Sequence, residues 1–282
     1  MLVNMKEMLD EAVKKGYAVG GFNCASLESA LAAIKAAEEL NLPFILQHAP
    51  AHEEYIALDI AGPIMIDLAK KSKVPVCVHL DHGPDVNIIA KALRLGFTSV
   101  MFDGSAMSFD DNVATTKLIT SMAHSLNVTV EAEIGSMPHN LKGEMKEYIP
   151  EDFYTKPDEA AQFAELTDVD ALAISFGTVH GIYKTTPKLS FDVIKQIRLS
   201  TGDLPLVMHG GSGLTEDDYK KAISSGIRKI NYYTYEALAG GKSVYDIVNK
   251  KPQGLLYHDV ATYATEVMKE DVKRVMKIFA NV

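Results

Sequence analysis

Short apolar runs and longer amphipathic stretches alternate along the whole chain. Eight runs are rich in Val, Ile, Leu and Met, and several are nearly continuous in these residues, as expected of parallel strands buried on both faces. The runs occupy residues 18–23, 43–49, 74–81, 98–104, 128–135, 171–177, 204–210 and 227–233. Pro43, Pro75 and Pro205 lie at the entrances of three runs, where the missing N–H costs little.

The stretches between the runs carry the periodicity and the end signals of helices. After Ser26, an expected helix cap, Leu27, Ala30 and Ile34 recur on one helical face. Gly96 stands where a helix would end before the next strand. Regular alternation of strands and helices predicts right-handed crossovers and a parallel sheet.

The length of the chain favours one form of such a sheet. Eight strand–helix units in 282 residues predict a closed barrel rather than an open, doubly wound sheet, because a barrel of about 250 residues forms a single domain. Residues 236–282 add a further helical stretch, and no linker or repeat interrupts the sequence. We therefore predict an α/β protein with a single (β/α)8 TIM-barrel domain over residues 1–282, ending in a helical C-terminal tail.

Composition and charge narrow the possible partners and the compartment. The net charge of -9 argues against nucleic acid and anionic membrane surfaces as partners. The N-terminus lacks the apolar core of a signal peptide, and no run of about 20 apolar residues could span a membrane. The two cysteines, Cys24 and Cys77, form no CxxC pair, which disfavours a thiolate zinc site. A reducing cytoplasmic location is the simplest interpretation.

Polar side chains gather at the C-terminal ends of the predicted strands. In a barrel these ends form the active-site face. The residues in question are Asn23, Asp81, His82, Asp103, Glu133, His180, His209 and Asn231. They come from seven different runs, so only a closed barrel would bring them together.

Three of these residues, His82, His180 and His209, are histidines that each precede a glycine. Three imidazoles and one open position are the usual ligands of a catalytic zinc ion, which can polarise a carbonyl group. The alternative is three unrelated polar residues on loops, which their common position makes less favourable. Asp81 precedes His82 directly, so both side chains can face the site only if the strand ends there, as Gly83 suggests.

Two further carboxylates allow two interpretations. Asp103 and Glu133 could offer oxygens to a second or displaced metal position, or could each pair with a lysine at the rim. Among the other histidines, we expect His79 to be a hydrogen-bonded core residue, and His48 and His52 stay open.

Glycine-rich loops follow the last strands of the predicted barrel. Residues 209–214 read HGGSGL, and small glycines let backbone N–H groups approach an anion. Ser212 and Thr234 add hydroxyl donors, and Gly181 after the sixth run can join them. Loops after strands seven and eight are the common phosphate site of such barrels.

The motifs LDHG, EAEIG, GTVHGIY, LVMHGGSGL and RKINYYT occur in this order and cover nearly the whole chain. Together they resemble the class II ketose-bisphosphate aldolases, which include fructose- and tagatose-bisphosphate aldolases. The resemblance implies a metal-dependent aldol cleavage of a phosphorylated ketose into dihydroxyacetone phosphate and an aldehyde. A lysine Schiff base would be the alternative electron sink. Lys229 lies early in its run, which favours the metal route.

The resemblance also assigns roles to individual residues. His82, His180 and His209 would bind Zn²⁺, and Asp81 would be the proton donor to the aldehyde carbonyl. Glu133 with Asp103 would serve an alternate metal position, and Asn23 would lie near the substrate. Dihydroxyacetone phosphate would be held by Gly181, Gly210, Gly211, Ser212, Asn231 and Thr234. A monovalent cation, Na⁺ or K⁺, often lies near the phosphate loops of this family.

The sequence departs from the family pattern in three places. The loop after EAEIG lacks the usual glycine pair, so Glu144 or Glu147 would be the catalytic base without support from spacing. Ala49 replaces a serine or threonine, and bulky Tyr232 and Tyr233 precede Thr234. These departures leave the metal chemistry intact and put the usual substrate in question.

Two other functions remain as alternatives. A zinc-dependent hydrolase on the same barrel often needs an H-x-H pair on the first strand, and AVGGFNC has none. A catalytically altered sugar-phosphate-binding homologue is consistent with the changed loop and Ala49. The expected partner is a small sugar phosphate, and the apolar tail helix favours a homodimer or homotetramer.

Overall fold

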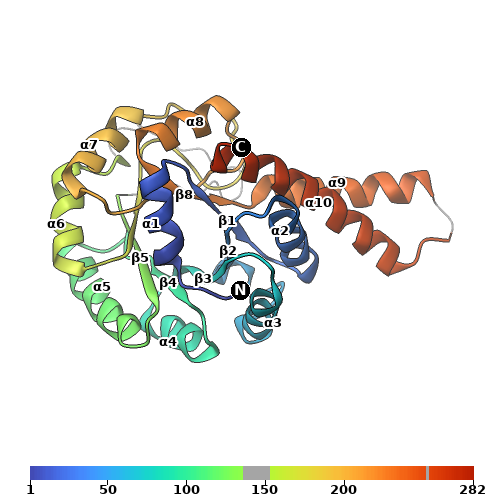
Figure 1. The fold of residues 1–282 in the computed structure, drawn as a ribbon, viewed down its shortest axis with the longest axis horizontal. Coiled ribbons are helices and arrows are strands. Elements are labelled where there is room, and N and C mark those ends of the chain that lie inside the picture. The colour runs from blue at the N-terminus through green and yellow to red at the C-terminus, as the bar shows by residue number, and fades with distance from the viewer. Residues whose placement is uncertain (136–152, 252–253) are drawn as a thin grey trace.

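In the computed structural model, which describes residues 1–135, 153–251 and 254–282, eight parallel strands close into a barrel in sequential order (Figure 1). The strands are β1 (Val19–Asn23), β2 (Phe44–His48), β3 (Val76–Gly83), β4 (Ser99–Phe102), β5 (Thr129–Ile134), β6 (Ala171–Ile174), β7 (Leu206–Met208) and β8 (Ile227–Tyr232). The predicted TIM-barrel fold is confirmed. Seven strands lie inside their predicted runs, whereas β3 continues beyond residue 81 to Gly83.

Helices surround the barrel and connect its strands. They are α2 (Leu27–Leu40), α3 (Leu58–Lys71), α4 (Val86–Leu95), α5 (Phe109–His124), α6 (Pro157–Thr167), α7 (Phe191–Thr201) and α8 (Glu216–Ser225), with a 3₁₀ turn η1 (Pro50–His52) before α3. Ser26 caps α2 as expected, and Gly96 ends α4 in the left-handed conformation.

The two faces of the strands differ sharply in polarity. Outward-facing residues such as Phe22, Leu46 and Val100 are fully buried in the apolar layer beneath the helices. Several inward-facing residues are polar yet equally buried, among them Gln47 and Glu131. Buried polar groups need partners, so the barrel interior must be organised by hydrogen bonds and ion pairs.

The N-terminal helix α1 (Met5–Lys15) closes the end of the barrel opposite the strand C-termini. Its buried face joins the lowest interior side chains in one apolar cluster of Met5, Met8, Leu9, Ala12, Val19, Ile45, Cys77, Ala171, Ala173 and Val207. This end is therefore sealed by apolar packing, and the polar interior meets the surface only at the other end.

The last two helices form an arm that projects beyond the barrel (Figure 1). Helix α9 (Thr234–Lys250) runs outward from β8, and α10 (Tyr257–Ala280) returns and packs against α9 and α2. Several large apolar side chains of the arm are exposed, namely Leu238, Val244, Tyr245, Val248, Leu256 and Tyr257. Within the described parts of the chain, no helix is both long and apolar enough to cross a membrane.

Candidate metal centre and substrate pocket

The three histidines singled out in the sequence converge at the C-terminal end of the barrel. Nε2 of His82 lies 3.3 Å from Nε2 of His180 and 2.9 Å from Nδ1 of His209. In a tetrahedral zinc site with Zn–N bonds of about 2.0–2.1 Å, two ligand nitrogens stand about 3.3 Å apart. The three nitrogen atoms therefore fit a common divalent cation.

An unusual backbone conformation brings His82 into this group. Its φ of 50° lies in the left-handed region, which residues other than glycine seldom adopt. The pairing of β3 with β4 also shifts register between Leu80 and Gly83. Asp81 and His82 share the site through this left-handed residue and register shift at the end of β3, whose last residue is Gly83, as the sequence suggested.

Carboxylates fix the ring nitrogens that face away from the other imidazoles. Nδ1 of His82 donates to Oδ2 of Asp103 at 2.7 Å, and Nε2 of His209 donates to Oε1 of Glu131 at 2.8 Å. Such contacts orient an imidazole ring and set which nitrogen is free to bind a metal. His82 would bind through Nε2 and His209 through Nδ1.

Glu133 adds a carboxylate directly beside the imidazoles. Its Oε2 is 3.7 Å from Nδ1 of His209 and 4.0 Å from Nδ1 of His82, and it is buried without a hydrogen-bond partner among the described residues. His82, Asp103 and Glu133 also form a group of potential metal ligands. Among the described residues, neither Asp103 nor Glu133 pairs with a lysine. This favours the interpretation that their oxygens could bind a metal.

The site is electrostatically suited to a cation. Burial opposes a charge on His82, but Asp81, Asp103 and Glu133 outweigh it and raise the pKa of His82 to about 10. Burial raises the pKa of the Glu133 carboxyl to about 7, with His209 opposing the rise. The same negative potential would stabilise either a proton on His82 or a divalent cation bound at the site.

Asp81 is held as a carboxylate by two side-chain amides. Asn23 Nδ2 donates to its Oδ2 at 2.8 Å, and Asn231 Nδ2 donates to its Oδ1 at 3.0 Å. Gln47 Nε2 in turn donates to Oδ1 of Asn23 at 3.0 Å. Burial would raise the pKa of Asp81, but the neighbouring histidines, His82 first, bring it far below its ordinary value.

The glycine-rich loop after β7 approaches its neighbours too closely for side chains. Gly210 has a φ of 65°, and a Cβ there would lie 2.4 Å from the carbonyl oxygen of Val179. A Cβ on Gly211 would lie 2.7 Å from the carbonyl oxygen of Asn231. Tyr183 joins the loops after β6 and β7, since its hydroxyl donates to the Gly210 carbonyl at 2.8 Å.

The remaining predicted phosphate residues surround this loop. Gly181 follows His180 with a φ of 92°, and Ser212 is buried, its Oγ accepting from the backbone N–H of Tyr233 at 2.9 Å. Thr234 is the first residue of α9 and half-buried. A helix N-terminus beside glycine-rich backbone is suited to an anion.

His52 and Tyr233 form an aromatic pair that bridges the loops after β2 and β8. Their ring centroids are 4.6 Å apart, and His52 is only 5% exposed. Burial, together with His48, lowers the pKa of His52 to about 4, although Asp81 acts in the opposite direction. The imidazole is therefore neutral at pH 7, and its Nδ1 has no hydrogen-bond partner among the described residues.

Beneath the imidazoles, Lys229 lies fully buried in the barrel interior. Its ammonium group contacts Oε2 of Glu131 at 2.6 Å and Nε2 of His79 at 3.5 Å. His79 is a hydrogen-bonded core residue, as expected, with Nδ1 at 2.8 Å from the hydroxyl of Ser99. The burial of its amine and the contact with Glu131 keep Lys229 away from a substrate carbonyl, which disfavours Schiff-base chemistry.

The structure places the predicted site residues that it describes at the C-terminal end of the barrel, whereas both candidates for the base, Glu144 and Glu147, lie outside the described residues. Sequence reasoning gave no role to Gln47 or Glu131, considered Lys229 only for a Schiff base, and left His48 and His52 open. Glu131 lies two residues before Glu133, so strand alternation could have placed it on the inner face.

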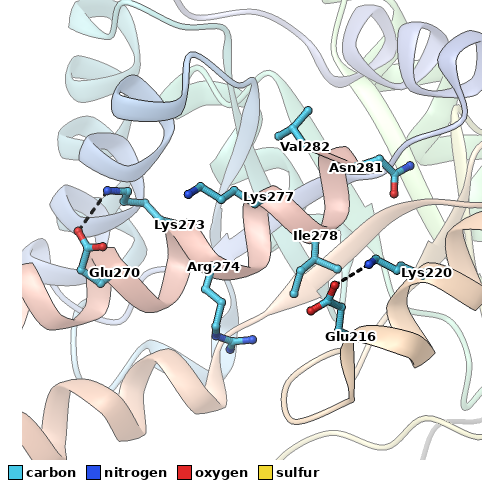
Figure 2. Close-up of a pocket in the computed structure, with 9 residues that line it drawn as sticks. All are labelled: Glu216, Lys220, Glu270, Lys273, Arg274, Lys277, Ile278, Asn281 and Val282. Carbon is cyan, nitrogen blue, oxygen red and sulfur yellow. Dashed lines mark hydrogen bonds and ion pairs between the residues drawn. The ribbon is translucent and has the colours of Figure 1, made fainter.

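A separate groove is lined by residues of α8 and α10 (Figure 2). It has a volume of about 620 Å³ and is lined by Glu216, Lys220, Glu270, Lys273, Arg274, Lys277, Ile278, Asn281 and Val282. Two of its lysines pair with glutamates on their own helices, Lys220 with Glu216 and Lys273 with Glu270. It lies on the outer side of α8 and α10 and holds none of the residues discussed above.

Comparison with known proteins shows the same family along the whole chain. A family model described as "Fructose-bisphosphate aldolase class-II" matches residues 3–282. The chain is 40% identical to the fructose-bisphosphate aldolase of Staphylococcus aureus strain Mu50 over 287 residues, covering 99% of this chain and 97% of the relative. It is also 40% identical to the probable fructose-bisphosphate aldolase of Bacillus subtilis strain 168 over 284 residues, covering 99% and 98%.

Solved structures give the same result. The crystal structure of the YdjI aldolase from Escherichia coli K12 matches with a TM-score of 0.88 at 33% identity, covering 99% of this chain and 97% of that one. A putative fructose-1,6-bisphosphate aldolase from Coccidioides immitis matches with a TM-score of 0.85 at 26% identity, covering 98% and 96%.

Proposed function

Because this chain belongs to the class II fructose-bisphosphate aldolase family, we propose that it cleaves a phosphorylated ketose by a reversible, zinc-dependent aldol reaction. The substrate would resemble fructose or tagatose 1,6-bisphosphate in its ketone half, and the products would be dihydroxyacetone phosphate and an aldehyde. The observation that supports this most directly is the convergence of three imidazole nitrogens beside a carboxylate held by two amides.

The metal site would consist of His82, His180 and His209, whose nitrogen atoms lie within 4.8 Å of one another. A zinc ion bound there would supply positive charge to the oxygens of the ketone half, where negative charge develops. Glu133 and Asp103 would serve an alternate position of the ion. The potential at the site favours a divalent cation, and three imidazoles favour zinc among such ions.

Asp81 would transfer the proton on the aldehyde side. During cleavage, its carboxylate accepts the proton of the hydroxyl group whose carbon becomes the aldehyde, and the electrons of the broken carbon–carbon bond pass to the ketone half. During condensation, the same oxygen returns the proton, which is the role that the resemblance implied. The amides of Asn23 and Asn231 keep both carboxylate oxygens in place for this exchange.

The phosphate of the ketone half would bind at the loops after β6, β7 and β8. Gly181, Gly210 and Gly211 would offer backbone N–H groups, and Ser212, Asn231 and Thr234 would offer side-chain donors. The close packing at Gly210 and Gly211 supports this assignment, because it requires backbone without side chains. A Na⁺ or K⁺ ion near these loops would balance part of the phosphate charge.

The aldehyde half would differ from that of the usual substrate. Ala49 stands where the family often has a hydroxyl group, and the neutral pair of His52 and Tyr233 joins the loops after β2 and β8. Neutral imidazole and phenol groups suit hydroxyl groups better than a second phosphate. We expect polyhydroxylated aldehydes among the products.

The proposal extends to the whole assembly. Residues 1–282 would act as one catalytic domain in the cytoplasm. The exposed apolar side chains of the α9–α10 arm would be covered in a homodimer or homotetramer.

The decisive experiment is a screen of phosphorylated ketoses for release of dihydroxyacetone phosphate, measured with a coupled dehydrogenase. Each substrate is assayed with the zinc-loaded protein, with a chelator, and after zinc is restored. We expect release that stops with the chelator and returns with zinc. Full activity in the presence of chelator would reject the metal mechanism, and release of inorganic phosphate alone would favour a hydrolase.

A further inference from the structure

A series of contacts between buried charged groups leads from the barrel interior to one of the candidate metal ligands. The ammonium group of Lys229 contacts Oε2 of Glu131 at 2.6 Å. The other oxygen of Glu131 accepts the hydrogen bond from Nε2 of His209 at 2.8 Å. All three side chains are fully buried, so water cannot replace these contacts.

The residues at the lower end of this series are of the types that bind metals. His79, Asp81 and Glu131 each offer a potential ligand atom, all within 4.8 Å of one another. The ammonium group of Lys229 lies against two of them, Glu131 and His79. A positive charge belonging to the protein therefore stands where a second divalent ion would be attracted.

We propose that Lys229 and Glu131 are positioning residues that hold His209 in the ring orientation and tautomer required for metal binding. An ionised carboxylate can only accept hydrogen bonds, so Nε2 of His209 carries the hydrogen and Nδ1 keeps its lone pair. Nδ1 is the atom that faces Nε2 of His82 at 2.9 Å. Lys229 acts on His209 through Glu131. This inference rests on the proposed function, because it assumes that the imidazoles bind a divalent metal.

Both Lys229 and Glu131 are needed to orient the ring of His209. Without Lys229, the Glu131 carboxylate would lose the fixed charge that holds it and would be free to rotate towards His79, whose Nε2 is 3.7 Å from its Oε2. A glutamine in place of Glu131 would offer a single acceptor oxygen, which could not serve Lys229 and His209 together. In either case the lone pair of Nδ1 would no longer be aimed at the other two imidazoles.

The test measures the affinity of the full-length protein for Co²⁺, by competition with a chromophoric chelator and by the visible absorbance of the bound ion. Lys229→Met removes the ammonium group, and Glu131→Gln removes the carboxylate with little change in volume. Groups that orient metal ligands typically contribute about 10- to 100-fold to metal affinity. We expect the Co²⁺ dissociation constant to rise by such a factor in each variant, with an altered absorbance spectrum.

Ser99→Ala is the matched control. Ser99 is fully buried in the same region, and its hydroxyl bonds Nδ1 of His79 rather than one of the three converging imidazoles. We expect this variant to unfold at a lower temperature while it keeps the Co²⁺ affinity and spectrum of the wild-type protein. A double variant of Lys229 and Glu131 should lose less affinity than the two single losses multiplied, because both act through His209.

Wild-type Co²⁺ affinity and absorbance in both single variants would overturn the proposal. If Lys229→Met does not fold, the nearly isosteric Glu131→Gln decides the question by itself. The aldolase assay is separate: a wild-type protein that binds Co²⁺ as expected but cleaves no ketose phosphate would reject the proposed function and leave the positioning roles standing.

Discussion

Two clusters of titratable residues lie one above the other inside this barrel, and they differ in how their negative charge is balanced. The upper cluster comprises His82, His180 and His209 with the carboxylates Asp103 and Glu133. The lower cluster comprises His79, Glu131 and Lys229, and it contains its own cation in ion-pair contact with Glu131. Together with Asp81, His79 and Glu131 of the lower cluster also form a group of potential metal ligands, so ligand composition alone does not identify the functional site.

Access to solvent separates the clusters as clearly as charge does. The side chain of His82 is 18% exposed and that of Asp103 is 20% exposed, whereas those of His79, Glu131 and Lys229 are wholly buried. The upper cluster is therefore open to solvent, whereas the lower cluster is closed to it. We infer that the lower cluster supports the upper one through the hydrogen bond from His209 to Glu131.

The largest effect should follow the loss of a ligand from the upper cluster. His180→Ala removes one of the three converging nitrogens, so zinc affinity should fall by more than the roughly 100-fold expected for a residue that only orients a ligand. Aldol cleavage should fall to the background rate. Zinc content after dialysis and the release of dihydroxyacetone phosphate measure the two effects.

His258→Ala provides the control for this change. His258 lies in α10 rather than at the end of a barrel strand, and its side chain is 75% exposed. It should retain both zinc and activity. Retention of zinc by His180→Ala at the wild-type level would break the distinction between the clusters.

The next largest effect should come from the carboxylate beside the upper cluster. Asp81→Asn preserves the size of the side chain but removes the proton acceptor, so kcat should fall by about 10²- to 10⁴-fold. Zinc content should be unchanged, because the proposed ligands are the three imidazoles and not Asp81. An unchanged kcat in the zinc-loaded variant would remove Asp81 from the proton-transfer role.

Strand alternation explains how far the sequence could predict these two clusters. The period of the apolar runs places Asp81 and His79 on one face of β3, and Glu131 and Glu133 on one face of β5. The three histidines could be grouped because each follows the core of a predicted strand. His82 has the opposite parity to Asp81, and only its left-handed backbone and the shifted register bring it to the same face.

Pair contacts within the barrel could not be predicted in this way. Lys229 and Glu131 lie 98 residues apart in sequence, and nothing in either local pattern shows that they meet. The same holds for His52 and Tyr233, whose ring contact depends on the conformations of two loops. Periodicity gives the face on which a residue lies, whereas the partner is set by barrel closure and side-chain packing.

The smallest expected effect concerns the acid stability of the lower cluster. Burial, reinforced by Lys229, lowers the pKa of His79 from 6.5 to about 3, although Glu131 opposes the shift. Below pH 6.5, His79 is therefore protonated in the unfolded chain but stays neutral in the folded protein. Stability falls by about 1.4 kcal/mol per pH unit from this residue as the pH is lowered towards 3.

His79→Gln should remove this contribution. We expect its free energy of unfolding, measured with urea in metal-free protein, to decline less steeply between pH 6.5 and 5 than that of the wild type, by about 1.4 kcal/mol per pH unit. Taking the difference between the two proteins cancels the titration of His52 and His82. Equal slopes would mean that His79 gains its proton in the folded barrel, and the lower cluster would then be open to solvent like the upper one.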